Sequence, residues 1–276
     1  MDIYQKRSKL QRVLFFVRWQ LWPVVASSPG HLGFVARGVS DRRFGVLSRA
    51  GLALRVMRVH LTLPCAHAPM ELLTIVEEIL TVPESRPGVV IECGTWIGGS
   101  TAKLSHAAAL AGRKLVVCDS FEGLPEVQAE DSLPDKDPFE SGGFAARLEQ
   151  VRDNVRRYGD LRVVEFVPGW FDKTLGTLPD RRVVCVFLDV DLQDSIKTCV
   201  SSLWARLEPG SKVFVHDVDR SPVFEPFQDR DWWAQHVASD LPEFVGALTG
   251  CGRQKRLLGY AVKARNNHSL TGDGSD

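Results

Sequence analysis

Five residues that can bind a metal or accept a proton follow two apolar segments, residues 183–188 and 212–215. They are Asp189 and Asp191 after the first segment, and His216, Asp217 and Asp219 after the second. Carboxylates that share a pocket repel one another unless a proton or a cation lies among them. Because oxygen-rich ligand sets suit Mg²⁺ or a similar hard ion, this pattern predicts a divalent metal site.

A metal at this place would bind two hydroxyls of a substrate and lower the pKa of one of them. Asp191 or His216 would then accept the released proton. The alternative is structural, with the aspartates capping helices and facing the solvent.

A glycine-rich turn joins a short apolar segment to a helix start in residues 88–101, GVVIECGTWIGGST. Strand, turn and helix in this order open a nucleotide-binding unit, and the glycines allow the backbone to approach a ligand. The spacing disfavours a dinucleotide, because Trp96 stands where the middle glycine would be. Glu92 suits a cationic ligand that carries an amino acid, so we expect S-adenosylmethionine (SAM). The alternative is a turn that binds nothing.

Asp119 follows the apolar residues 115–118 and lies 27 residues after Glu92 (119 − 92). A carboxylate at the end of this strand can accept two hydrogen bonds from a ribose diol, although a helix cap is the alternative. An aromatic residue at 170 or 171 is expected to stack on adenine or to pack in the core. The predicted SAM-binding residues are Glu92, Gly94, Thr95, Trp96, Ser100, Asp119, Ser120, Gly169, Trp170, Phe171 and Asp189.

The elements that must position these residues alternate between strand length and helical periodicity. Strands are predicted at residues 89–91, 115–118, 162–167, 183–188 and 212–215, and helices at 67–80, 100–111, 144–158 and 195–207. Residues 243–248 and 256–264 are expected to form a closing antiparallel pair. The predicted fold class is α/β, a doubly wound, mostly parallel, seven-stranded Rossmann-like sheet, which binds ligands at the carboxyl ends of its strands.

Residues 1–60 differ from the rest, with eleven Lys or Arg and two acids. We expect a basic N-terminal helical arm that packs on the core or on a second subunit and lies outside the fold core. Contact with an anionic membrane is the less favoured alternative. Residues 61–264 would form the main domain, with 126–143 as a mobile lid, and 265–276 a disordered tail.

The chain has 276 residues, 44% of them hydrophobic, and a formal net charge of +0. These values suit one soluble domain with an appendage and argue against dedicated nucleic-acid binding. The six Cys are scattered without zinc-site spacing, so the expected location is a reducing cytoplasm. No run is long enough to cross a membrane, and Arg18 interrupts the segment that is superficially similar to a signal peptide.

Five motifs in order resemble the macrocin O-methyltransferase (TylF/MycF-type) family over residues 68–262. They are ECGTWIGGST, DSFEGLP, PGWFDKTL, LDVDLQDS and the His-Asp pair at 216–217. The resemblance implies a class I SAM methyltransferase fold and Mg²⁺-dependent methylation of a sugar hydroxyl in natural-product biosynthesis. It also implies a homo-oligomer.

The resemblance implies that Asp189 and Asp217 are metal ligands, that Asp191 is the general base, and that Asp119 binds the ribose. His216 departs from the pattern, because the family's sugar enzymes have a second Asp there. It is predicted as a third ligand, softer than a carboxylate, or as a second base.

Two other functions stay open. An NAD-dependent oxidoreductase is disfavoured by Trp96 and by the scarcity of Tyr, of which there are three. A SAM-binding module without enzymatic activity could dock through its basic arm. In the favoured function, an alkoxide attacks the methyl group of SAM, and catalysis comes mostly from positioning the two in a dry pocket.

Overall fold

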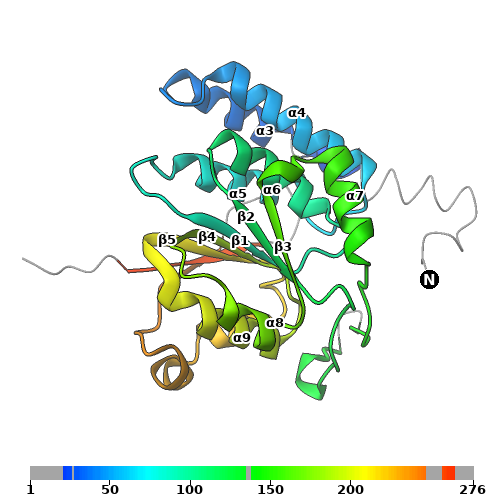
Figure 1. Cartoon of the computed structure of the whole chain (residues 1–276), viewed down its shortest axis with the longest axis vertical. Helices are drawn as coiled ribbons and strands as arrows, with labels where there is room; N and C mark the ends of the chain where they lie inside the picture. Colours follow the sequence, from blue (N-terminus) through cyan, green and yellow to red (C-terminus); the bar gives the residue numbers. More distant parts are fainter. Residues whose placement is uncertain (1–20, 27, 135–137, 247–256, 265–276) are drawn as a thin grey trace, which may run out of the picture.

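Seven strands form one sheet in the order β3-β2-β1-β4-β5-β7-β6 (Figure 1). The structure is a computed structural model that describes residues 21–26, 28–134, 138–246 and 257–264. The strands are β1 (Val89–Cys93), β2 (Leu115–Asp119), β3 (Val164–Pro168), β4 (Val183–Leu188), β5 (Leu207–Val215), β6 (Phe244–Gly246) and β7 (Gly259–Val262). Pairs from β3 to β5 are parallel, and β7 is antiparallel to β5 and β6. The predicted doubly wound sheet and its closing antiparallel pair are confirmed.

Helices cover both faces of this sheet (Figure 1). One face carries α5 (Pro69–Thr81), α6 (Gly99–Leu110) and α7 (Leu148–Tyr158), with α3 (Ser28–Ala36) and α4 (Val46–Thr62) stacked outside them. The other face carries α8 (Phe171–Thr174) and α9 (Gln193–Leu203). The remaining α-helices of the described residues are short, namely α2 (Trp22–Ala26), α10 (Ser221–Phe224) and α11 (Arg230–Trp232).

The central strands are almost entirely apolar because both faces of the sheet are covered. Successive side chains alternate between the two sides of the sheet. Val90 and Cys185 pack in the core with α5 and α6, whereas Ile91 and Val186 pack in the core with α9. Both faces of the sheet are therefore covered by helices, and a ligand site can form only at its edges.

Strands β4 and β5 are neighbours, with Leu188 opposite Val215. The residues that follow them therefore emerge side by side at the carboxyl edge, as predicted from the sequence. The sequence predicts a helix that ends at residue 207 and a strand that begins at residue 212. In the structure α9 ends at Leu203, a 3₁₀ turn follows, and β5 begins at Leu207, so Pro209 lies inside the strand. The β4–β5 register shifts there, and such an irregularity tolerates a residue that has no N–H.

The described part of the basic arm belongs to the core. Phe34, Leu52 and Val56 from α3 and α4 pack in the same buried cluster as residues of α5, α6 and β1. The buried Arg49 side chain donates hydrogen bonds to Asp41 at 2.7 Å and to Glu77 at 2.6 Å. The prediction that the arm lies outside the fold core is wrong for these residues, because their apolar side chains cover α5 and α6.

No helix in the described ranges is both long enough and apolar enough to span a bilayer. The predicted tail, residues 265–276, lies outside the described residues, as does the start of the arm, residues 1–20.

Leu52→Ala is expected to lower the free energy of unfolding by about 2–5 kcal/mol, because Leu52 is 3% exposed in the core. Leu54 lies two residues further along α4 and is 62% exposed. Leu54→Ala should therefore change the same quantity by less than about 0.5 kcal/mol. Urea unfolding measures both variants, and equal effects would contradict the assignment of α4 to the core.

Candidate active site

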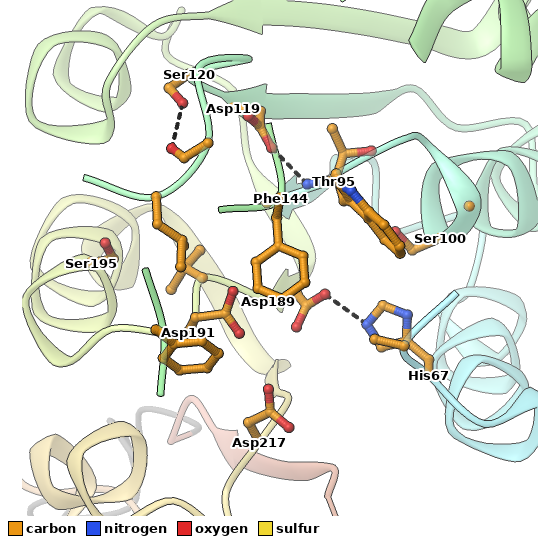
Figure 2. Close-up of a pocket in the computed structure, with 18 of the residues that line it drawn as sticks. His67, Thr95, Ser100, Asp119, Ser120, Phe144, Asp189, Asp191, Ser195 and Asp217 are labelled. Atoms are coloured by element: carbon orange, nitrogen blue, oxygen red, sulfur yellow. Dashed lines mark hydrogen bonds and ion pairs between the residues drawn. The ribbon is translucent and has the colours of Figure 1, made fainter. Parts of the chain in front are cut away.

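A cavity of about 140 Å³ opens at the carboxyl edge of the sheet, between the turns that follow β1, β2, β4 and β5 (Figure 2). Most of the predicted site residues line it, namely Gly94, Thr95, Trp96, Ser100, Asp119, Ser120, Trp170, Phe171, Asp189, Asp191 and Asp217. Glu92, Gly169 and His216 were also predicted, but they are not among the lining residues. The fold thus brings residues from five separate motifs to one place.

The turn after β1 is held tightly against the end of β4. Gly94 has a φ of +82°, and a Cβ there would lie 1.9 Å from the carbonyl oxygen of Asp189. Glycine is therefore required here even without a ligand, because the ends of β1 and β4 meet at this point. Trp96 in the same turn has a φ of +46°, which is a strained conformation for a bulky residue.

Glu92 is fully buried beneath this turn. Its Oε2 accepts a hydrogen bond of 2.6 Å from the hydroxyl of Thr101, which ties β1 to the first turns of α6. Burial raises the pKa of Glu92 to about 7, against the effect of hydrogen bonds from Ser100 and Thr101. The observed role of Glu92 is to organise the turn, and direct contact with SAM stays a prediction.

Asp119 connects the turns after β1 and β2. Its Oδ2 accepts a hydrogen bond of 2.7 Å from the N–H of Thr95, and its Oδ1 accepts one of 2.7 Å from the N–H of Phe121. Burial raises the pKa of Asp119, and these backbone donors oppose the rise. Because each carboxylate oxygen has two acceptor positions, both can still accept a hydroxyl of a ligand.

The carboxylates of Asp189, Asp191 and Asp217 each bring an oxygen within 4.8 Å of the others. Figure 2 shows them around one part of the cavity. Asp191 and Asp217 have positive φ values of 62° and 55°, so sharp turns at the ends of β4 and β5 create this grouping. Burial raises the pKa of Asp191 well above 3.8, and the charges of Asp189 and Asp217 add to the rise.

This group fits a hard divalent cation. It offers several oxygen donors in a small, partly buried space, and a cation would relieve their mutual repulsion. Nδ1 of His216 faces the same carboxylates, 3.2 Å from Asp189 Oδ1 and 3.4 Å from Asp217 Oδ1. Burial lowers the pKa of His216, but the charges of Asp217 and Asp189 outweigh it and raise the pKa well above 6.5.

His67 is a site residue that the sequence analysis missed. It lies just before α5, lines the cavity, and places Nε2 2.8 Å from Oδ2 of Asp189 (Figure 2). Burial would lower the pKa of His67, but the charge of Asp189 outweighs burial and raises it to about 10. Asp189 thus lies between His67 and His216, and these two imidazoles hold its pKa below the usual range despite burial.

Aromatic rings cover the cavity from the loop that follows β2. The ring of Phe144 lies 5.7 Å from that of Trp96 and 6.3 Å from that of Phe139, measured between centroids. The guanidinium of Arg220 lies 4.0 Å from the centroid of Phe139. The loop predicted as a lid therefore reaches the site, and its motion stays a prediction.

The sequence profile described as macrocin-O-methyltransferase (TylF) matches residues 67–257, which is more than half of the chain. The chain belongs to the macrocin O-methyltransferase (TylF) family. The resemblance drawn from the five motifs is confirmed, and the matched segment begins at His67.

Two relatives and one solved structure illustrate the similarity. The 8-demethyl-8-(2,3-dimethoxy-alpha-L-rhamnosyl)-tetracenomycin-C 4'-O-methyltransferase of Streptomyces olivaceus is 40% identical over 138 residues, 48% of this chain and 53% of that protein. The mycinamicin III 3''-O-methyltransferase of Micromonospora griseorubida is 31% identical over 140 residues, 48% and 55% of the two chains. The chain spans about half the length of the curated relatives it matches. The O-methyltransferase NovP shares the fold, with a TM-score of 0.56 and 24% identity, covering 72% of this chain and 81% of that one.

Substitution of Glu92 tests its buried carboxyl group. Because its pKa is raised from 4.5 to about 7, the folded protein binds more protons than the unfolded chain between these values. Glu92 therefore makes stability fall as the pH rises through this window. Glu92→Gln removes the titration, so its stability relative to wild type should increase from about pH 5 to about pH 8.

Urea unfolding at several pH values measures this difference. Glu122 is exposed, and Glu122→Gln is the matched control, which should show no such trend. A pH-independent difference between Glu92→Gln and wild type would contradict the assignment.

Proposed function

We propose that this protein transfers the methyl group of SAM to a hydroxyl of a small glycosylated molecule, with Mg²⁺ at the carboxylate group. The observation that carries the proposal is a shared cavity. The glycine turn and Asp119 line the same space as Asp189, Asp191 and Asp217. A methyl donor and an acceptor hydroxyl could then meet in one pocket, and such positioning supplies most of the catalysis for this reaction. Family membership supports the same reaction.

The donor side of the pocket would be formed by the ends of β1, β2 and β3. Asp119 would accept hydrogen bonds from the two ribose hydroxyls, and Trp170 or Phe171 would pack against the adenine. Ser100 lies in the first turn of α6, where backbone N–H groups can bind the carboxylate of the amino-acid end.

The acceptor side would be formed by the ends of β4 and β5. Asp189, Asp217 and, once it has lost its proton, Nδ1 of His216 would hold the cation, which when bound supplies a Lewis acid that lowers the pKa of a hydroxyl. Asp191 would take the proton from the acceptor hydroxyl. His67 keeps Asp189 oriented toward the pocket through their 2.8 Å contact.

The class of acceptor is inferred from relatives. The name of the Streptomyces olivaceus relative places a methyl group at a 4'-oxygen and includes a rhamnosyl group. The Micromonospora griseorubida relative acts at a 3''-oxygen of mycinamicin III. A sugar hydroxyl also suits the pocket chemically, because adjacent hydroxyls can chelate a cation. The family match favours this function over the NAD-dependent oxidoreductase and over the SAM-binding module.

The homo-oligomer, the cytoplasmic location and the division of the chain after residues 60 and 264 stay predictions. Exposed apolar residues on the arm support the predicted homo-oligomer, because Leu32 is 71% exposed and Leu47 is 88% exposed. The same residues are compatible with the less favoured contact with an anionic membrane.

Asp119→Ala is expected to weaken binding of S-adenosylhomocysteine (SAH) by about 1–3 kcal/mol, because the ribose hydroxyls would lose their acceptor. Isothermal titration calorimetry measures the affinity. Asp172 is an exposed neighbour of Phe171, so Asp172→Ala is a control that should leave the affinity unchanged. Unchanged affinity in Asp119→Ala would rule out the ribose role.

Asp191→Asn is expected to slow methyl transfer by about 10²–10⁴-fold and to leave SAH affinity unchanged, because the amide keeps the shape of the side chain but cannot accept the proton.

Asp189→Ala is expected to slow methyl transfer as well, and the remaining activity should no longer respond to Mg²⁺. The assay follows SAH formation with a rhamnosylated tetracenomycin acceptor, with Mg²⁺ or with EDTA. Asp172→Ala is again the control. Full activity of Asp189→Ala in EDTA would overturn the metal-dependent mechanism.

A further inference from the structure

A buried lysine lies beneath the cavity without a carboxylate partner. Lys103 on α6 is 0% exposed, and its Nζ lies 2.9 Å from Sγ of Cys65 and 3.4 Å from Nδ1 of His60. No carboxylate of the described residues forms an ion pair with it. A buried ammonium group is costly unless an anion or strong acceptor compensates it.

Among the described residues, Cys65 alone can supply a negative charge to this contact. His60 is 1% exposed, and burial lowers its pKa, so it offers Lys103 a neutral imidazole. Burial raises the pKa of the Cys65 thiol, but the charges of Lys103 and His67 outweigh burial and hold it well below 9.0. Nδ1 of His67 lies 3.3 Å from Sγ and adds a second contact to the sulfur.

Cys65 is also accessible from the cavity. It is partly exposed and lines the pocket beside His67, where a Cβ on Gly99 would lie 3.6 Å from Sγ. The other described cysteines, Cys93, Cys118, Cys185 and Cys199, are buried. A thiolate that faces an open cavity is the reactive form of cysteine, whereas a buried neutral thiol is inert.

We propose that Cys65 is a modification site, a thiolate paired with Lys103 that reacts with small, uncharged carbon electrophiles entering the cavity. With iodoacetamide, an electron pair of sulfur forms the S–C bond, and iodide leaves with the electrons of the C–I bond. No proton has to leave Cys65, and Lys103 keeps its own. The adduct occupies the cavity next to His67 and Gly99. The reaction does not depend on methyl transfer.

The test measures labelling of Cys65 by iodoacetamide as a function of pH. Cys251 lies outside the described residues, so the full chain carries Cys251→Ser, and peptide mass spectrometry reads each remaining cysteine. We expect the labelling rate of Cys65 to reach half of its maximum at least one pH unit below the ordinary thiol value of about 8.5. At pH 6.5, labelling should be about tenfold faster than that of the same cysteine in the urea-unfolded chain. The four buried cysteines should stay unlabelled.

Two variants at one position separate the charge of Lys103 from its bulk. Lys103→Met should move the midpoint upward toward about 8.5, and Lys103→Arg should keep it low. Circular dichroism confirms that each variant is folded. A wild-type midpoint at or above about 8.5 overturns the proposal whether or not the variants fold. An unchanged midpoint in a folded Lys103→Met variant overturns the pairing with Lys103.

Discussion

A line of contacts between ionisable side chains runs along the wall of the cavity, and the geometry of the site depends on it. Its members, in order, are Lys103, Cys65, His67, Asp189, His216 and Asp217, with successive contacts of 2.9, 3.3, 2.8, 3.2 and 3.4 Å. Each internal group contacts two neighbours, so replacing one group leaves both neighbours without that partner, which costs more than the contact itself contributes. Asp189 is the central member, because its two oxygens are held by two imidazoles.

The backbone around this line is strained at the points that form the pocket. Trp96, Asp191 and Asp217 all have positive φ values and all line the cavity. Such conformations persist only where the surrounding structure holds them in place. The rigid central strands provide that support, since β1 and β4 are buried along their length and Gly94 allows their ends to touch. A stable sheet thus supports turns that would be unfavourable alone.

The donor and acceptor halves of the proposed reaction share these supports. Asp119 joins the turns after β1 and β2, and Asp189 joins the end of β4 to His67 and to the residues after β5. The helix α4 also contributes, because it places His60 against Lys103 of α6. The arm is for this reason part of the structure that builds the site, although its composition differs from the rest of the chain.

The sequence by itself determined where the strands lie along the chain and which residues follow their carboxyl ends, because apolar periodicity and local spacing report on neighbouring residues along the chain. It therefore predicted that Asp189, Asp191, Asp217 and Asp219 would gather beside the SAM site, and the structure groups the first three of them. Only the tertiary structure brought Cys65 to Lys103 and His67 to Asp189, because these partners lie far apart along the chain and no spacing rule connects them. It also decided that α4 is core, since burial depends on what packs against a helix and not on its charge.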